Sequence, residues 1–237
     1  MSQSQIDGNV EIVLVHGLFI GPWAWTRVRE ILSSRFTVHA PQLPFASLET
    51  DAALVRELVA SLNSQGRTIL LVGHSYGGMV ISQAGHDAAH LCYLGALLPE
   101  PGQTAADVSG ICVSATCAEA MVSSDDGKWI SLDSEKSVAA LYHLCLPTDV
   151  AFASARHRPA PAAIFAETVQ RPAWLDRPAT YIVCDGDQAV APAYQRACGQ
   201  RLGSMLNVSG DHSAFFSADM EVATAIAGLA SALTVPD

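Results

Sequence analysis

The sequence predicts an α/β protein with a doubly wound, mainly parallel sheet of about six strands and one inserted helical segment. Three observations support this fold class. Short aliphatic and β-branched runs alternate with helix-length amphipathic segments along the chain. The runs are apolar almost throughout, which is typical of strands covered on both faces. One region, residues 100–175, lacks this alternation and is too long for a loop of a compact domain.

Six apolar runs are expected to form the strands. They lie at residues 11–17, 36–40, 68–74, 91–98, 180–186 and 204–210. Because strand and helix alternate along the chain, the strands should run parallel and the helices should cover both faces of the sheet.

The segments between these runs have the length and the amphipathic pattern of helices. Helices are therefore expected at residues 22–34, at 48–66, directly after Ser75, at 192–203 and near 218–233. Together with the strands, they account for most of the chain outside the inserted region.

Residues 100–175 are expected to form a helical cap on a core made of residues 1–99 and 176–237. The region holds helix-like pieces such as "SEKSVAALYHLCL" and "PAPAAIFAETV", separated by prolines, and no clean strand is predicted within it. We therefore expect the cap to be helical.

The composition argues against several classes of partner and location. The chain of 237 residues has a formal net charge of −10 and no cluster of Lys or Arg, which argues against nucleic acid and anionic membranes as partners. The first residues lack a basic region followed by a long apolar run, and nothing approaches the ~18 consecutive apolar residues of a membrane span. We expect a soluble, cytoplasmic protein; a homodimer is the assembly to be considered.

Six cysteines occur, at positions that form no tight framework. They are Cys92, Cys112, Cys117, Cys145, Cys184 and Cys198. Because no secretory signal is present, we interpret them as reduced packing residues rather than as disulfide or zinc ligands.

The stretch "TILLVGHSYGGMVISQAG", residues 68–85, predicts a nucleophile. A strand runs into Gly-x-Ser-x-Gly and then into a helix. Gly73 and Gly77 permit the sharp, strained turn that exposes Ser75 above the sheet edge. A serine hydroxyl is a weak nucleophile, so partners are required elsewhere in the chain.

The base and its acid are expected after the last two strands. "NVSGDHSAFF" provides His212, and "YIVCDGDQAVAP" provides Asp185 and Asp187. We favour Asp187, because Asp185 still belongs to the strand end, and Ser, Asp, His is the chain order expected for such a turn. Glu100, just past the strand at 91–98, is a rival acid.

Two further expectations concern neighbours of this site. Asp211 is interpreted as a loop or turn residue, since adjacent side chains rarely aim at one another. The loop after the first strand should provide an oxyanion hole, with the N–H groups of Leu18 and Tyr76 as donors. His16 in that loop is interpreted as structural.

Other motifs are weaker. "HDAAH" at 86–90 places histidines four residues apart, but the pattern lacks a third ligand, and no metal site is predicted. Aromatic residues are candidates for an apolar substrate pocket. They are Phe19, Trp129, Tyr142, Phe152, Phe165 and Trp174.

Five motifs carry a resemblance to a known family. "LVHGLFIGPWAW", "VGHSYGGMV", "LLPEPGQ", "TYIVCDGDQAV" and "SGDHSAFFS" resemble the α/β-hydrolases grouped with plant methylesterases and hydroxynitrile lyases, and their bacterial esterase relatives. The resemblance implies an α/β-hydrolase fold, a triad of Ser75, His212 and Asp187, a cap over an apolar pocket, and no cofactor.

Members of this group differ in chemistry, so the fold does not decide the function. The lyases carry a lysine just after the catalytic histidine and a threonine in the oxyanion loop. Ser213 and Gly17 stand at those positions here. We therefore expect an esterase that acts on small apolar or aromatic, carboxylic or carbamic esters. Alternatives are a cofactor-independent dioxygenase, a lyase, and a ligand-binding receptor with little turnover.

Overall fold

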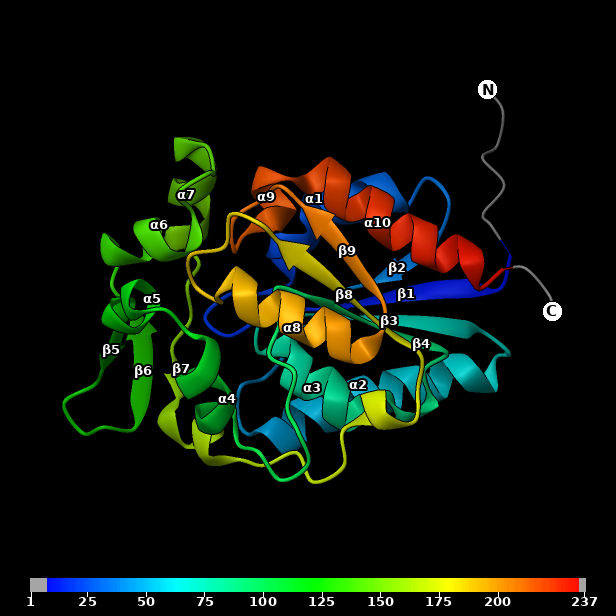
Figure 1. The fold of residues 1–237 in the computed structure, drawn as a ribbon, viewed down its shortest axis with the longest axis horizontal. Helices are drawn as coiled ribbons and strands as arrows, with labels where there is room; N and C mark the ends of the chain where they lie inside the picture. The colour runs from blue at the N-terminus through cyan, green and yellow to red at the C-terminus, as the bar shows by residue number, and fades with distance from the viewer. Residues whose placement is uncertain (1–7, 235–237) are drawn as a thin grey trace.

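A computed structural model describes residues 8–234 of the chain. Its centre is a six-stranded sheet in which every neighbouring pair of strands is parallel (Figure 1). The strands are β1 (Val10–Val15), β2 (Thr37–His39), β3 (Thr68–His74), β4 (His90–Leu94), β8 (Ala179–Cys184) and β9 (Met205–Val208). Each coincides with one of the predicted runs, so the predicted fold class is confirmed.

Helices cover both faces of this sheet (Figure 1). One face carries α2 (Leu48–Ser64), α3 (Gly77–Ala84) and α8 (Pro192–Leu202), and the other carries α1 (Thr26–Leu32), α9 (Ala214–Ser217) and α10 (Asp219–Ala232). The short 3-10 helices η1 (Pro22–Trp25) and η2 (Gly85–Asp87) adjoin α1 and α3.

Alternation along β1 explains why two layers of helices are needed. Successive side chains of a strand point to opposite faces. Ile12 and Leu14 pack in one apolar cluster, while Val13 and Val15 pack in the other. All four are completely buried, so both faces must be covered.

The strand order β2-β1-β3-β4-β8-β9 places a topological switch point between β1 and β3. The chain leaves β1 to form β2 on one side and then crosses to β3 on the other. In open α/β sheets, ligands bind outside the carboxyl ends of strands at such a point.

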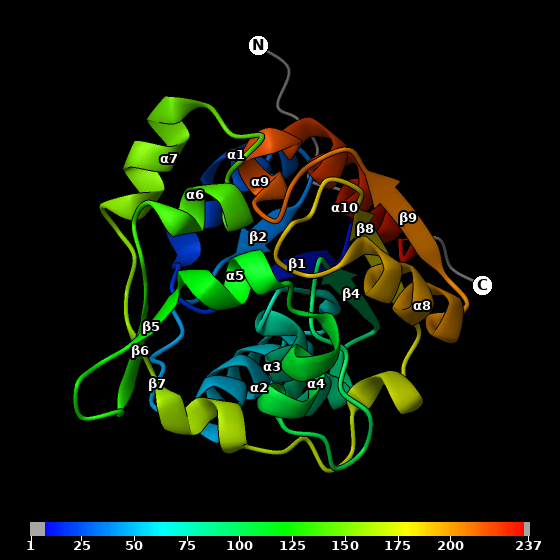
Figure 2. The ribbon, with the colours of Figure 1, turned by 60° about the vertical axis from the view of Figure 1, so that its left-hand side comes forward.

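Residues 100–175, here called the inserted segment, lie beside the carboxyl ends of the strands in both ribbon views (Figures 1 and 2). The helices are α4 (Ala105–Cys112), α5 (Ala115–Ala120), α6 (Lys136–Leu141), α7 (Pro147–Ser154), η3 (Ala162–Ala166) and η4 (Ala173–Leu175). The division of the chain into a core and a cap stays a prediction.

The expectation that the inserted segment contains no strand is wrong. A small antiparallel sheet joins β5 (Met121–Ser123), β6 (Trp129–Leu132) and β7 (Ala160–Pro161). These strands have two to four residues and are largely half-buried or exposed. Such short strands have too few residues to produce a recognisable apolar period.

Within the described part of the chain, no helix combines the length and the apolar character that a bilayer crossing requires. The six cysteines all lie in described positions and are unpaired, and five of them are buried.

Candidate active site

The turn between β3 and α3 holds Ser75 in a strained conformation. Its φ of 54° lies in the left-handed region, which few residues other than glycine adopt. The glycines of the motif permit this turn because the backbone is tightly packed. A Cβ on Gly73 would lie 2.5 Å from the Gly77 carbonyl oxygen, and one on Gly77 would lie 2.7 Å from that of Val15. The predicted sharp turn between β3 and α3 is therefore present.

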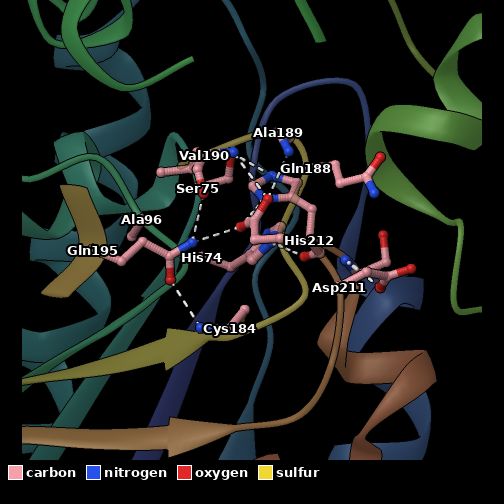
Figure 3. Close-up of polar contacts among 12 residues, drawn as sticks. His74, Ser75, Ala96, Cys184, Gln188, Ala189, Val190, Gln195, Asp211 and His212 are labelled. Atoms are coloured by element: carbon pink, nitrogen blue, oxygen red, sulfur yellow. Dashed lines mark hydrogen bonds and ion pairs between the residues drawn. The ribbon is translucent and has the colours of Figure 1, made fainter. Parts of the chain in front are cut away.

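Three side chains from separate loops form a continuous hydrogen-bonded chain. His212, between β9 and α9, places Nε2 3.1 Å from Ser75 Oγ (Figure 3). Its Nδ1 lies 2.8 Å from Oδ2 of Asp187, which follows β8. A carboxylate only accepts, so Nδ1 carries the proton and Nε2 presents a lone pair to the Ser75 hydroxyl. His212 and Asp187 are buried, while Ser75 is half-buried at a pocket.

Asp187 is fixed by donors on both oxygens. Its Oδ1 accepts from the N–H groups of Ala189 at 2.7 Å and Val190 at 2.9 Å. Oδ2, the oxygen that faces His212, also accepts from Gln195 Nε2 at 2.8 Å. The carboxylate can therefore rotate little.

Gln195 is a member of the site that the sequence did not indicate. Its completely buried amide donates from Nε2 to Asp187 and to the Val190 carbonyl, and its Oε1 accepts from Cys184 N–H (Figure 3). These partners fix which way the amide points. The only sequence signal is a polar residue on the otherwise packed face of α8, which belongs to no known motif.

The electrostatics of the two neighbouring histidines differ. Burial disfavours a charged His212 ring, but the Asp187 carboxylate and its hydrogen bond outweigh burial and raise the pKa of His212 above 6.5. Burial, and then the nearby His212, hold the pKa of His74 well below 6.5. His74 Nε2 donates to the His212 carbonyl at 2.8 Å. Only His212 is therefore prepared to accept a proton.

The two predicted oxyanion donors both lie at the pocket. Leu18 and Tyr76 line it beside Ser75. The backbone of Gly17 packs so closely on the turn that a Cβ there would lie 2.8 Å from Ser75 Cβ. Within residues 8–234, neither the Leu18 nor the Tyr76 N–H donates a hydrogen bond. Both remain available to a ligand oxygen.

The rival acids lie elsewhere. Asp185 pairs with Arg196 at 2.7 Å on the surface. Glu100 forms an exposed ion pair with Arg201. Asp187 is thus the carboxylate that the structure brings to His212.

An apolar pocket opens in front of Ser75. In the part of the chain that the structure describes, no Asp, Glu, Lys or Arg lines it. Much of its wall comes from the inserted segment, including Cys117, Met121, Leu132, Leu141, Tyr142 and Phe165. The wall thus combines the inserted segment with core loops, which contribute residues such as Leu18, Leu97 and Ala189.

Three of the six aromatic residues predicted for the pocket line it: Phe19, Tyr142 and Phe165. The other three are corrected by the structure. Trp129 is 47% exposed on β6. Phe152 packs edge-on against Trp23 outside the pocket, with ring centroids 5.6 Å apart. Trp174 packs toward α3 and donates to the Pro99 carbonyl at 2.9 Å.

His16 lies within its loop, as expected for a structural residue. Its Nε2 accepts from Leu43 N–H at 3.1 Å, so Nδ1 donates to the Gly17 carbonyl. Burial lowers the pKa of His16 to about 4. The ring therefore stays neutral and holds the loop in place.

The histidines of "HDAAH" bind different neighbours. His86 Nε2 donates to the Arg171 carbonyl, while His90 Nε2 lies 2.9 Å from Thr180 Oγ1. Among the described residues, no three His, Cys, Asp or Glu side chains are arranged to hold a metal ion.

Comparisons with known proteins identify the family to which this chain belongs. The model of the alpha/beta hydrolase family matches residues 12–225. An alpha/beta hydrolase of Aspergillus novofumigatus is 26% identical over 186 residues, which are 72% of this chain and 73% of that protein. Salicylic acid-binding protein 2 of Nicotiana tabacum is 26% identical over 219 residues, 78% of this chain and 82% of that one.

Among solved structures, polyneuridine aldehyde esterase superposes with a TM-score of 0.80. The match covers 93% of this chain and 99% of that chain at 19% identity, so it is a likeness of fold. The predicted resemblance to the α/β-hydrolases is confirmed by the family match.

Proposed function

Because this chain belongs to the α/β-hydrolase family, we propose that it is a serine esterase that cleaves small apolar or aromatic esters, carboxylic or carbamic, through an acyl-enzyme. One observation carries this proposal. Ser75 Oγ, His212 and Asp187 form an unbroken chain of hydrogen bonds of 3.1 and 2.8 Å at the mouth of a pocket. That arrangement supplies a nucleophile, a base and the group that orients the base.

In the first half-reaction, Ser75 Oγ attacks the ester carbonyl carbon while His212 Nε2 takes the hydroxyl proton. The carbonyl oxygen becomes an oxyanion and accepts hydrogen bonds from the N–H groups of Leu18 and Tyr76. When the tetrahedral species collapses, the bond to the alcohol oxygen breaks. The alcohol leaves with the proton from His212, and the acyl group stays on Ser75.

The second half-reaction repeats these steps with water. His212 takes a proton from water, whose oxygen attacks the acyl carbon, and the bond to Ser75 Oγ then breaks. The proton returns to Ser75, and the free acid leaves. Asp187 keeps Nδ1 protonated throughout and stabilises the imidazolium that forms twice in each cycle.

The pocket supports the proposed class of substrate. Among residues 8–234, no Asp, Glu, Lys or Arg lines the wall, so a charged acyl or alcohol group would lose hydration without gaining such a partner. Phe19, Tyr142 and Phe165 provide aromatic contacts. A neutral, apolar or aromatic ester fits this wall better than a sugar or a phosphate ester.

The loop beside Ser75 favours hydrolysis over cyanohydrin cleavage. A Cβ on Gly17 would lie 2.8 Å from Ser75 Cβ, which leaves no room for the lyase threonine unless the backbone shifts. Ser213, at the position of the lyase lysine, has no charge. Neither lyase feature is therefore present.

The test is steady-state hydrolysis of p-nitrophenyl acetate and of a neutral aryl carbamate. We expect turnover by the wild type, its loss in Ser75→Ala, and unchanged rates in Ser64→Ala, which alters an exposed serine at the end of α2. Undiminished turnover by folded Ser75→Ala protein would contradict the proposal. Oxygen uptake with a heteroaromatic substrate, or tight binding without product, would indicate the dioxygenase or the receptor instead.

A further inference from the structure

The loop that carries His212 holds a second carboxylate, which the mechanism above does not use. Asp211 directly precedes His212 and is completely buried. A buried carboxylate loses its hydration and persists only where other groups replace the water. Its surroundings therefore indicate what it does.

Donors surround both oxygens of Asp211. Oδ1 accepts from the Ser213 N–H at 3.0 Å and from the Ser217 hydroxyl at 2.8 Å, and Oδ2 accepts from the Leu144 N–H at 2.8 Å. The Cys145 thiol lies 3.6 Å from Oδ2. Hydrogen-bond donors thus replace the lost water at both oxygens of Asp211. In residues 8–234, no Lys or Arg pairs with it.

Two hydrogen bonds join the His212 loop to the inserted segment, and the Asp211 carboxylate accepts one of them. One runs from Leu144 N–H to Asp211. The other is shared: Ser213 N–H donates to Asp211 and also to the Leu141 carbonyl at 3.2 Å. Leu141 and its neighbour Tyr142 line the pocket. The same carboxylate thus fixes the base and part of the pocket wall.

The charge of Asp211 also acts on the imidazole. Asp187 faces His212 from the loop after β8, and His74 faces it from β3 with ring centroids 4.7 Å apart. His143, with Nδ1 3.9 Å from Oδ2, and the Cys145 thiol face Asp211 from the inserted segment. Burial opposes a charged His212, and Asp187 first and Asp211 after it raise the pKa of His212.

Resting on the proposed function, we propose that Asp211 is a positioning residue, which fixes the His212 loop against residues 141–145 and stabilises the imidazolium that forms when Ser75 attacks. It touches no substrate and acts through His212. Asp187 orients the ring by a direct hydrogen bond, whereas Asp211 holds the backbone on either side of the ring.

Asp211→Asn tests this role, because it removes the charge while keeping the size and one acceptor oxygen. Asp185→Asn is the matched control, since it makes the same change on the surface at the end of β8. The first readout is an NMR titration of the His212 ring in a Ser75→Ala background. We expect His212 to titrate at lower pH with Asn at position 211 and at unchanged pH with Asn at 185.

The second readout is the pH profile of hydrolysis by protein that retains Ser75. In Asp211→Asn, the acid limb of kcat/KM should move to lower pH, and the plateau of kcat should fall about tenfold, as expected for a slightly displaced base. In the Asp185→Asn control, neither should change.

Unchanged titration of His212 in folded Asp211→Asn protein would overturn the inference. If that variant does not fold, Ser217→Ala takes its place. It removes a hydrogen-bond donor from Oδ1 of Asp211, so the negative charge of Asp211 should act more strongly on His212, which should titrate at higher pH. An unchanged titration of His212 in Ser217→Ala would overturn the role. The NMR titration needs no turnover, so a wild type that hydrolyses no ester contradicts the esterase and leaves this test readable.

Discussion

The reacting groups and the pocket wall are built in different ways. Ser75, Asp187 and His212 lie on loops after β3, β8 and β9, held by buried hydrogen bonds and by close backbone contacts. Much of the wall comes from the inserted segment, whose helices and strands are short. The first arrangement fixes the positions of the Ser75, Asp187 and His212 side chains, while the second determines the shape of the pocket. Changes near the reacting atoms should therefore alter kcat, and changes in the wall should alter which ester is preferred.

The largest effect should follow Asp187→Asn. An amide in place of the carboxylate can hold the wrong His212 tautomer and no longer stabilises the imidazolium. A loss of about 10⁴-fold in kcat is expected on the precedent of other triads. Steady-state kinetics with an aryl ester measures it. A loss below tenfold would mean that another carboxylate serves His212, and Asp211→Asn would then be the variant to measure.

These two regions also differ in how far the sequence predicts them. The turn at Ser75 was predictable from the sequence, because Gly73 and Gly77 are needed where the backbone packs too closely for a Cβ. The choice of Asp187 over Asp185 followed from the strand end. In the structure Asp185 N–H still pairs with the Val208 carbonyl and its side chain faces outward, while Asp187 lies beyond that pairing.

The pocket wall was predicted only in part, for a physical reason. Whether Phe152, Phe165 or Trp174 faces the pocket depends on how short elements pack on one another, and aromatic residues suit any apolar contact. Gln195 was missed because its role exists only when α8 lies against the loop after β8. Side-chain direction between elements is not encoded by a local pattern.

A second prediction probes the close contact beside Ser75. In Gly17→Ala the new Cβ would approach Ser75 Cβ to 2.8 Å, so the nucleophile or the oxyanion loop must shift. A displacement of this kind should lower kcat about 10²-fold. Gly228→Ala is the control, because a Cβ at that position in α10 meets no atom within 4 Å. Equal activity of both variants would show that the loop at Gly17 can shift without any effect on kcat.

A smaller effect is expected in the wall. Met121 on β5 lines the pocket, whereas its neighbour Val122 is 45% exposed. Met121→Ala should reduce kcat/KM for a bulky aryl ester relative to the acetate by about tenfold, because one apolar contact surface is lost. Val122→Ala should change neither ester. If Met121→Ala lowered kcat for both esters equally, the proposed separation between the wall and the reacting groups would be wrong.

The smallest effect concerns pH, and it separates activity from stability. The pKa of His212 is raised above 6.5 in the folded chain, because the neighbouring carboxylates outweigh the burial that opposes charge. A base must be neutral, so the acid limb of kcat/KM should have its midpoint above pH 6.5. Folding stability should respond in the opposite direction. The contribution of His212 is fully present below its unfolded pKa and is lost as pH rises through the folded pKa.

Chemical unfolding of the wild type and of His212→Gln, measured across this pH range, checks the sign. The stability difference between the two proteins should shrink as pH rises, while the wild-type rate increases. A difference that grew with pH would mean that burial, and not Asp187, controls the ring. Stability and activity would then both increase with pH. In that case Asp187 could not explain both the acid limb of the rate and the stabilisation of charged His212.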